Sequence, residues 1–80
     1  MAFFLLQHQH DPVECAAAFA AWNGFASPLR HRQAASTCLS GGHSVWWRVQ
    51  AENAAAALAL LPPYVARRTV PIAVRDIEIP

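Results

Sequence analysis

Apolar residues cluster or alternate in four short segments of the chain, and each segment is typical of a β-strand. The first segment begins with the apolar run FFLL and becomes polar toward its end. Strands are therefore predicted at Ala2 to about Gln9, Gln33 to Leu39, His43 to Gln50 and Thr69 to Ile79. Because side chains on a strand alternate between two faces, one face of the first strand is expected to carry Phe4, Leu6, His8 and His10.

Helical signals lie between the first and second of these strands. The sequence DPVE predicts a helix start, with Asp11 as the N-cap, Pro12 at the first helical position and Glu14 at the capping-box position. The helix is expected to run to about Trp22 and to end at the NG pair that follows. Its apolar stripe is predicted to be Cys15, Phe19, Trp22 and Ala26.

A second helix is predicted between the third and fourth strands. It starts at Glu52 or Asn53 and is broken by Pro62-Pro63, after which YVARR is expected to form one more turn. The residues predicted on its inner face are Ala54, Ala57, Leu58 and Leu61.

The resulting order, β-α-β-β-α-β, predicts one α+β domain over residues 1–80. With right-handed crossovers this order gives the ferredoxin-like fold, a four-stranded antiparallel sheet with two helices on one face. The first and third strands are the central neighbours in that topology.

Adjacent tryptophans on the third strand raise the question of what covers the second one. Val45, Trp47 and Val49 are expected to face the helices, which places Trp46 and Arg48 on the open face of the sheet. The chain is 55% hydrophobic and 14% charged, so a monomer has few polar groups with which to cover itself. We therefore expect self-association that covers Trp46.

The last half of the chain, GGHSVWWRVQAENAAAALALLPPYVARRTVPIAVRDIEIP, resembles the dimeric α+β barrel superfamily, and within it the small muconolactone isomerase-like proteins. The resemblance implies a homodimer in which the open sheet faces of two chains pack together. It also implies a pocket between sheet and helices, to which Phe19, Trp22, Tyr64 and His8 contribute. The activities it implies are cofactor-independent ones of the isomerase, cyclase or monooxygenase type.

Charge argues against several classes of partner. The net charge of +1 comes from six arginines, with no lysine, which is no footprint for a nucleic acid or an anionic membrane. No apolar run reaches membrane-spanning length, and two cysteines are too few for a disulfide scaffold. A cytoplasmic protein is expected.

His43 is the leading candidate for chemistry, together with Trp46, Trp47 and Arg48. Aromatic walls, a group that titrates near neutral pH and a fixed cation suit an anionic or cyclic small molecule. In an enzyme, His43 would act as acid or base and Arg48 would hold substrate charge. The alternative is that the tryptophans fill the core and His43 is a turn residue.

Histidines also raise the possibility of a metal site. His8 and His10 could present two imidazoles to one ion, with His31, His43, Cys15 or Cys38 completing the set. The preferred interpretation is that these two histidines are half-solvated, that both cysteines are inert buried thiols, and that Arg30, His31 and Arg32 solubilise a loop. The sequence thus favours a small-molecule-binding protein without metal or cofactor, and leaves catalysis undecided.

Overall fold

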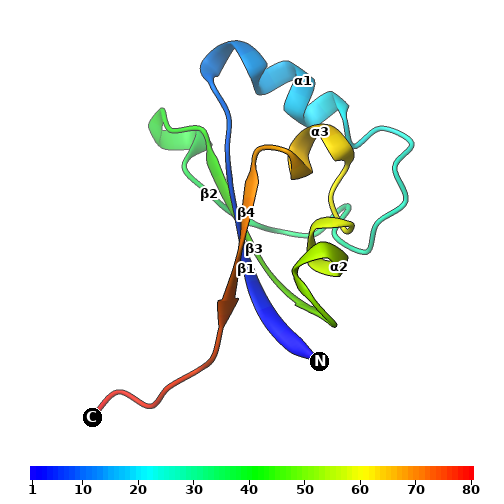
Figure 1. Ribbon diagram of the computed structural model, residues 1–80. Coiled ribbons are helices and arrows are strands. Elements are labelled where there is room, and N and C mark those ends of the chain that lie inside the picture. The colour runs from blue at the N-terminus through cyan, green and yellow to red at the C-terminus, as the bar shows by residue number, and fades with distance from the viewer.

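The computed structural model describes residues 1–80 and contains all four predicted strands, in an antiparallel sheet with short helices on one face (Figure 1). The strands are β1 (Ala2–Gln9), β2 (Ala35–Ser36), β3 (Ser44–Ala51) and β4 (Thr69–Val74). Their order across the sheet is β2-β3-β1-β4, so β1 and β3 are the central pair, as predicted. The helices are η1 (Pro12–Glu14), α1 (Cys15–Ala20), η2 (Cys38–Ser40), α2 (Ala54–Leu58) and α3 (Pro63–Ala66).

The pleat of the central strands assigns each side chain to a face. Leu6 lies opposite Trp47 and Gln7 lies opposite Trp46, so the adjacent tryptophans point to opposite faces of the sheet. The face that carries Trp47 is covered by the helices. All four residues predicted to share one face of β1 are buried there, namely Phe4, Leu6, His8 and His10. The expectation that the two histidines are half-solvated is therefore wrong, because they are 1% and 5% exposed and lie under the helices.

The core lies between this face and the second half of the chain. Apolar side chains from β1, β3, α2 and α3 form one buried cluster, which consists of Phe4, Leu6, Val49, Ala51, Ala57, Leu61 and Val65. Trp22 and Trp47 pack at its edge. The longest helix, α1, has six residues, and no helix combines the length and apolarity needed to cross a membrane.

The first helix begins where predicted but is shorter than expected. The Asp11 amide donates a hydrogen bond to Oε1 of Glu14 (2.9 Å), which fixes the first turn as a 3-10 helix. The α-helix then ends at Ala20 instead of Trp22, and turns lead to Gly24, whose φ of 74° is in the left-handed region. The predicted stripe is also wrong at two positions, because Phe19 is 58% exposed, with Ala18 buried in its place, and Ala26 is exposed beyond the end of the helix.

The second strand is much shorter than the predicted span from Gln33 to Leu39. Only Ala35 and Ser36 pair with β3, since Thr37 starts a tight turn. The Thr37 carbonyl accepts from the amides of Ser40 (3.0 Å) and Gly42 (2.9 Å). A Cβ on Gly42 would collide with the Thr37 side chain, so the close approach requires glycine. The segment consists mostly of small residues with weak strand propensity, which explains why the strand gives way to a turn so early.

The second helical segment consists of two short helices. Oδ1 of Asn53 accepts from the Ala56 amide (2.8 Å), which confirms Asn53 as the N-cap. The helix α2 ends at Leu58, and α3 supplies the extra turn predicted after the prolines. Ala54 was predicted on the inner face, but it is exposed because it occupies the first, outward-facing position of the helix.

The last strand ends at Val74 instead of Ile79. Val74 pairs with Phe3, and β1 begins at Ala2, so the chain beyond Val74 has no neighbouring strand to bond. Residues 75–80 accordingly leave the sheet and extend away from the body (Figure 1).

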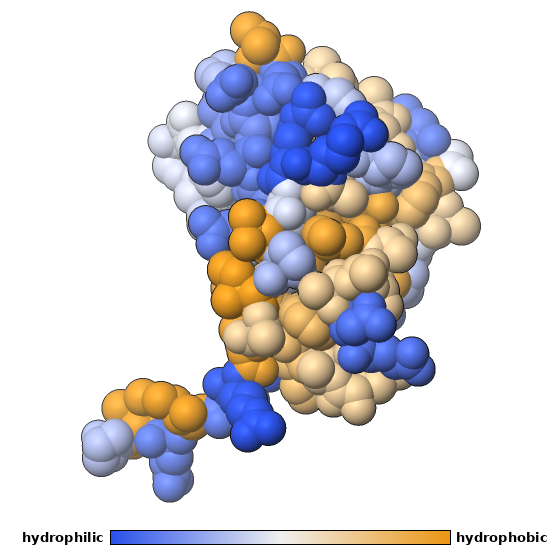
Figure 2. Space-filling model, viewed as in Figure 1, coloured by the Kyte–Doolittle hydropathy of each residue, from blue (hydrophilic) through white to orange (hydrophobic).

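The other face of the sheet carries no helix. Its side chains include Phe3, Val70 and Ile72, which are 42%, 60% and 37% exposed, and the half-buried Leu5, Trp46 and Val74. Figure 2 shows apolar surface along the front strand, β4. The guanidinium of Arg48 lies 4.7 Å from the centre of the Phe3 ring and forms an ion pair with Asp76 (2.9 Å).

Candidate functional site

A cavity of about 380 Å³ lies between the helix-covered face of the sheet, α1 and the loop before β2. Its lining is mainly apolar, with a group of imidazoles and guanidiniums. The lining residues are His8, His10, Ala18, Phe19, Trp22, Leu29, Arg30, His31, Arg32, Ala34, Ser36, Val45, Trp47 and Val65.

Aromatic rings form one continuous wall of this cavity. The Trp22 and Trp47 rings are 5.8 Å apart, and His8 lies 6.1 Å from Trp47. Trp47 projects from β3 and His8 from β1, while Trp22 comes from the turns after α1. Two of the three rings are therefore held by the central, mutually hydrogen-bonded strands of the sheet.

The loop beside the cavity contributes its positive charge. The Ser27 hydroxyl donates to the Leu60 carbonyl (2.7 Å) and accepts from the Leu29 amide (3.1 Å), which ties this loop to the end of α2. His31 has a φ of 64°, an uncommon value for a residue other than glycine. Arg30 and Arg32 flank it and line the cavity, a more specific location than the solubilising loop expected from the sequence.

A chain of hydrogen bonds fixes the buried histidines. The Thr69 hydroxyl donates to the Val65 carbonyl (2.7 Å), and Nδ1 of His8 lies 3.1 Å from that hydroxyl oxygen and 3.3 Å from the same carbonyl. A carbonyl oxygen only accepts, so Nδ1 of His8 must carry the hydrogen. Burial lowers the pKa of His8, and the neighbouring His10 lowers it further, so the ring is neutral and its Nε2 is an acceptor.

The form of His10 follows from that of His8. Nε2 of His8 is 2.8 Å from Nδ1 of His10, so Nδ1 of His10 must be the donor. When the His10 ring is neutral, only one of its nitrogens carries a hydrogen, so Nε2 then has a bare lone pair. His10 is 5% exposed, and this nitrogen has no hydrogen-bond partner in the protein.

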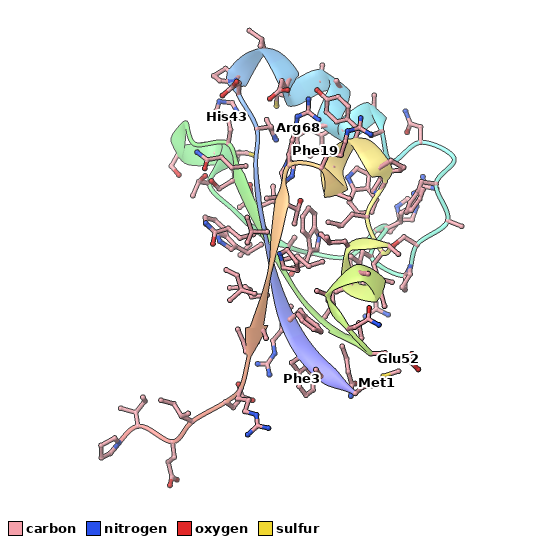
Figure 3. The ribbon with its side chains drawn as sticks, in the orientation of Figure 1. Met1, Phe3, Phe19, His43, Glu52 and Arg68 are labelled. Atoms are coloured by element: carbon pink, nitrogen blue, oxygen red, sulfur yellow. The ribbon has the colours of Figure 1, made fainter.

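A third histidine and a cysteine lie beside His10. One ligand atom from each of His10, Cys15 and His43 lies within 4.8 Å of those of the other two. Nδ1 of His43 is also buried without a hydrogen-bond partner. The His10 amide donates to the His43 carbonyl (3.1 Å), and Figure 3 shows His43 near the first helical turn after β1.

An ion pair closes the helical side of this region. Nη2 of Arg68 lies 2.6 Å from Oε2 of Glu14, and the Arg68 guanidinium packs 3.8 Å from the centre of the Tyr64 ring. The hydrogen bond from Arg68 holds the pKa of Glu14 below its ordinary value. This pair connects the start of α1 to the end of α3.

The structure brings together some of the predicted site residues and separates others. His8, Trp22 and Trp47 line the cavity, whereas Trp46 and Arg48 point to the open face, so the four-residue pocket predicted around His43 is not assembled. Tyr64 packs against Arg68 outside the cavity lining. His43 lies against His10, with ring centres 5.4 Å apart, and is not among the lining residues.

Comparison of the chain with models of protein families, with curated proteins and with solved structures finds no match.

Proposed function

We propose that the chain binds a small anionic aromatic or cyclic compound in the cavity between the sheet and α1. The observation that carries this proposal is one pocket, open to solvent, whose lining combines aromatic rings with two arginines. Its volume, about 380 Å³, lies in the range typical of ligand pockets. Rings such as those of Trp22 and Trp47 favour stacking of a flat apolar body.

The arginines favour a negative charge on the ligand. Arg30 and Arg32 are the cationic side chains of the lining, and the acidic side chains of the chain lie elsewhere. A guanidinium binds a carboxylate or a phosphate through paired hydrogen bonds, so these residues suit an anionic substituent on the ring. The neutral imidazole of His8 adds a polar group to the floor.

Catalysis of the cofactor-independent isomerase, cyclase or monooxygenase type is a second candidate. It is favoured by the bare Nε2 of His10, because His10 lines the cavity and an unprotonated imidazole nitrogen can accept a proton from a bound molecule. The sequence assigned this role to His43. The cavity contact makes His10 the better candidate for the base.

We further propose that the fold is ferredoxin-like and that two copies pair through their open sheet faces, as in the dimeric α+β barrels. The strand order β2-β3-β1-β4 and the helices on one face support the first part. The half-exposed apolar side chains on the open face, among them Phe3, Ile72 and Trp46, support the second. A second copy of the same surface would cover them symmetrically.

The ligand proposal can be tested with salicylate, an aromatic carboxylate, added to the ¹⁵N-labelled protein and followed by NMR. The indole N–H signals of Trp22 and Trp47 are expected to shift and saturate, while that of Trp46 stays in place. Shifts confined to Trp46, or no saturable shift, would contradict the proposal.

A pair of variants tests the role of charge. Replacing Arg30 and Arg32 together by Gln should weaken salicylate binding about tenfold or more, since a hydrogen bond to a charged group contributes about 1.5–3 kcal/mol. Arg67→Gln is the matched control, because Arg67 is exposed and lies outside the cavity lining. Equal affinities for the two variants would remove the arginines from the site.

A further inference from the structure

Three metal-binding side chains converge at the junction of β1, α1 and the turn before β3. His10 is the residue after β1, Cys15 is the first residue of α1, and His43 immediately precedes β3. No side-chain hydrogen bond or ion pair joins the three ligand groups to one another. Both free nitrogens, Nε2 of His10 and Nδ1 of His43, are shielded from water without a partner in the protein. Buried nitrogens left in this way cost free energy unless something binds them.

The hydrogen bonds already present prepare His10 as a ligand. A histidine that binds a metal through one nitrogen usually donates its other ring N–H to an acceptor, which fixes the tautomer and the ring orientation. Nδ1 of His10 donates to Nε2 of His8 at 2.8 Å, and His8 is held by Thr69 and Val65. This bond holds the His10 ring in position and leaves its Nε2 as the nitrogen that faces the cluster without a partner.

The backbone holds the other two ligands close to His10. The hydrogen bond from the His10 amide to the His43 carbonyl joins the two segments directly. Cys15 follows the 3-10 turn that the bond between Asp11 and Glu14 fixes. Cys15 and His43 are both partly exposed, so an ion can enter from solvent.

We propose that Cys15, His10 and His43 form a zinc site, with Sγ, Nε2 and Nδ1 as the ligand atoms. Thiolate and imidazole together suit Zn²⁺ among the common metal ions. Zinc bonds of about 2.0–2.3 Å place tetrahedral ligand atoms about 3.3–3.8 Å apart, so atoms that now lie within 4.8 Å of one another can close around an ion by side-chain rotation. Three protein ligands leave the fourth position for water or a bound molecule.

The zinc site does not depend on the proposed small-molecule function, although His10 belongs to both. Saturable salicylate shifts without metal binding would support the cavity and reject the zinc site. Metal binding without salicylate shifts would support the zinc site and reject the cavity as the binding site for salicylate.

Cobalt is the most direct probe. The full-length chain, reduced and freed of metal with a chelator, is titrated with Co²⁺ and followed by absorbance. One Co²⁺ per chain is expected, with a sulfur-to-cobalt charge-transfer band and the intense visible bands of a four-coordinate ion, and Zn²⁺ should bleach both. Failure of the wild-type chain to bind Co²⁺, or binding without the charge-transfer band, would overturn the proposal.

Variants assign the ligands. Cys15→Ser should abolish the charge-transfer band, while Cys38→Ser, the matched control, should leave the spectrum and the affinity unchanged. His43→Ala, at a partly exposed position, should weaken Co²⁺ binding about tenfold or more. Persistence of the band in Cys15→Ser, or unchanged affinity in His43→Ala, would reject the site. These two positions are partly exposed, so the test does not need a variant of the buried His10.

His8 is a positioning residue in this site. His8→Phe removes the acceptor for the Nδ1 hydrogen of His10, and the affinity for Co²⁺ should fall about 10–100-fold while the charge-transfer band persists. Loss of the band in His8→Phe, with the fold intact by circular dichroism, would mean that His8 acts in some way other than through His10.

Discussion

The two faces of the sheet differ sharply although they are built from alternate residues of the same strands. The covered face carries Leu6, His8 and Trp47, which meet helices, a cavity and a hydrogen-bonded group of imidazoles. The open face carries Leu5 and Trp46, which meet no helix. A shift of one position along a strand therefore moves a side chain from the face that lines the cavity to the face that carries no helix.

Polar side chains on the two faces also differ in what they bond to. On the covered face, the buried histidines and threonine bond to one another, so each bond fixes the state of the next group. On the open face, the charged groups Arg48 and Asp76 bond to each other at the solvent boundary. Buried polar networks specify geometry strongly because an unpaired member is costly, whereas exposed pairs are readily replaced by water.

The largest expected effect comes from cutting back neighbouring leucines on the two faces. Leu6 is fully buried, so Leu6→Ala should lower the free energy of unfolding by about 2–5 kcal/mol, through lost burial and the cavity left behind. Leu5→Ala, one residue away, should cost less than about 1.5 kcal/mol in dilute solution. Urea denaturation followed by circular dichroism measures both.

Equal losses for the two leucines at low protein concentration would contradict the assignment of faces. A cost for Leu5→Ala that grows with protein concentration would instead sharpen it, because burial of the open face by a second copy depends on mass action.

The next largest effect is expected on association. Burial of most of an aromatic side chain contributes about 1.5–3 kcal/mol, so Trp46→Glu should raise the dissociation constant of the proposed dimer at least about tenfold. Sedimentation velocity over a range of concentrations reports the change. Ala55→Glu, which places the same charge on the exposed surface of α2, is the control and should sediment like the wild type.

The smallest effect concerns the ion pair on each face. The side chains of Arg68 and Glu14, on the covered side, are 27% and 24% exposed, whereas those of Arg48 and Asp76 are 45% and 81% exposed. Each pair lowers the pKa of its carboxyl from an ordinary value of 4.5 for Glu14 and 3.8 for Asp76, chiefly by the arginine hydrogen bond.

A lowered carboxyl pKa contributes stability that is present above its unfolded-state value and is lost as the pH falls through its folded-state value. Stability of the wild type should therefore fall below about pH 4.5 partly through Glu14. In urea denaturation, Glu14→Gln should reduce the loss of unfolding free energy at acid pH more than Asp76→Asn does, because solvent screens the exposed pair. If Asp76→Asn reduced the pH dependence of stability more than Glu14→Gln does, the exposed ion pair would contribute more to stability than the covered one, contrary to the expectation.

Local patterns in the sequence predicted the central features of the fold. Alternation in FFLLQHQH placed Phe4, Leu6, His8 and His10 together, and the burial of all four confirms it. The short polar signals at Asp11 and Asn53 located both helix starts, because capping depends on neighbouring residues alone.

Features that depend on distant partners were not predictable in the same way. The end of β4 is set by where β1 begins, which the alternating residues after Val74 do not reveal. The histidine and cysteine cluster depends on the bond between His10 and His43, from segments far apart in the chain. The sequence grouped Trp46 and Arg48 with His43 because they are close in sequence, and the pleat separates them.

The hydrogen bond from Thr69 to Val65 is the first of a series that reaches the cluster of His10, Cys15 and His43 through His8. Because the Thr69 hydroxyl donates to the Val65 carbonyl, its oxygen is left to accept from Nδ1 of His8, and Nε2 of His8 in turn accepts from Nδ1 of His10. The proposed zinc site could be sought in other proteins by its two histidines and its cysteine alone. Such a search would also find histidines that lack these hydrogen bonds and carry their hydrogen on the other nitrogen. The recognisable signature includes a hydroxyl on the last strand, which never touches the ligand atoms whose form it sets.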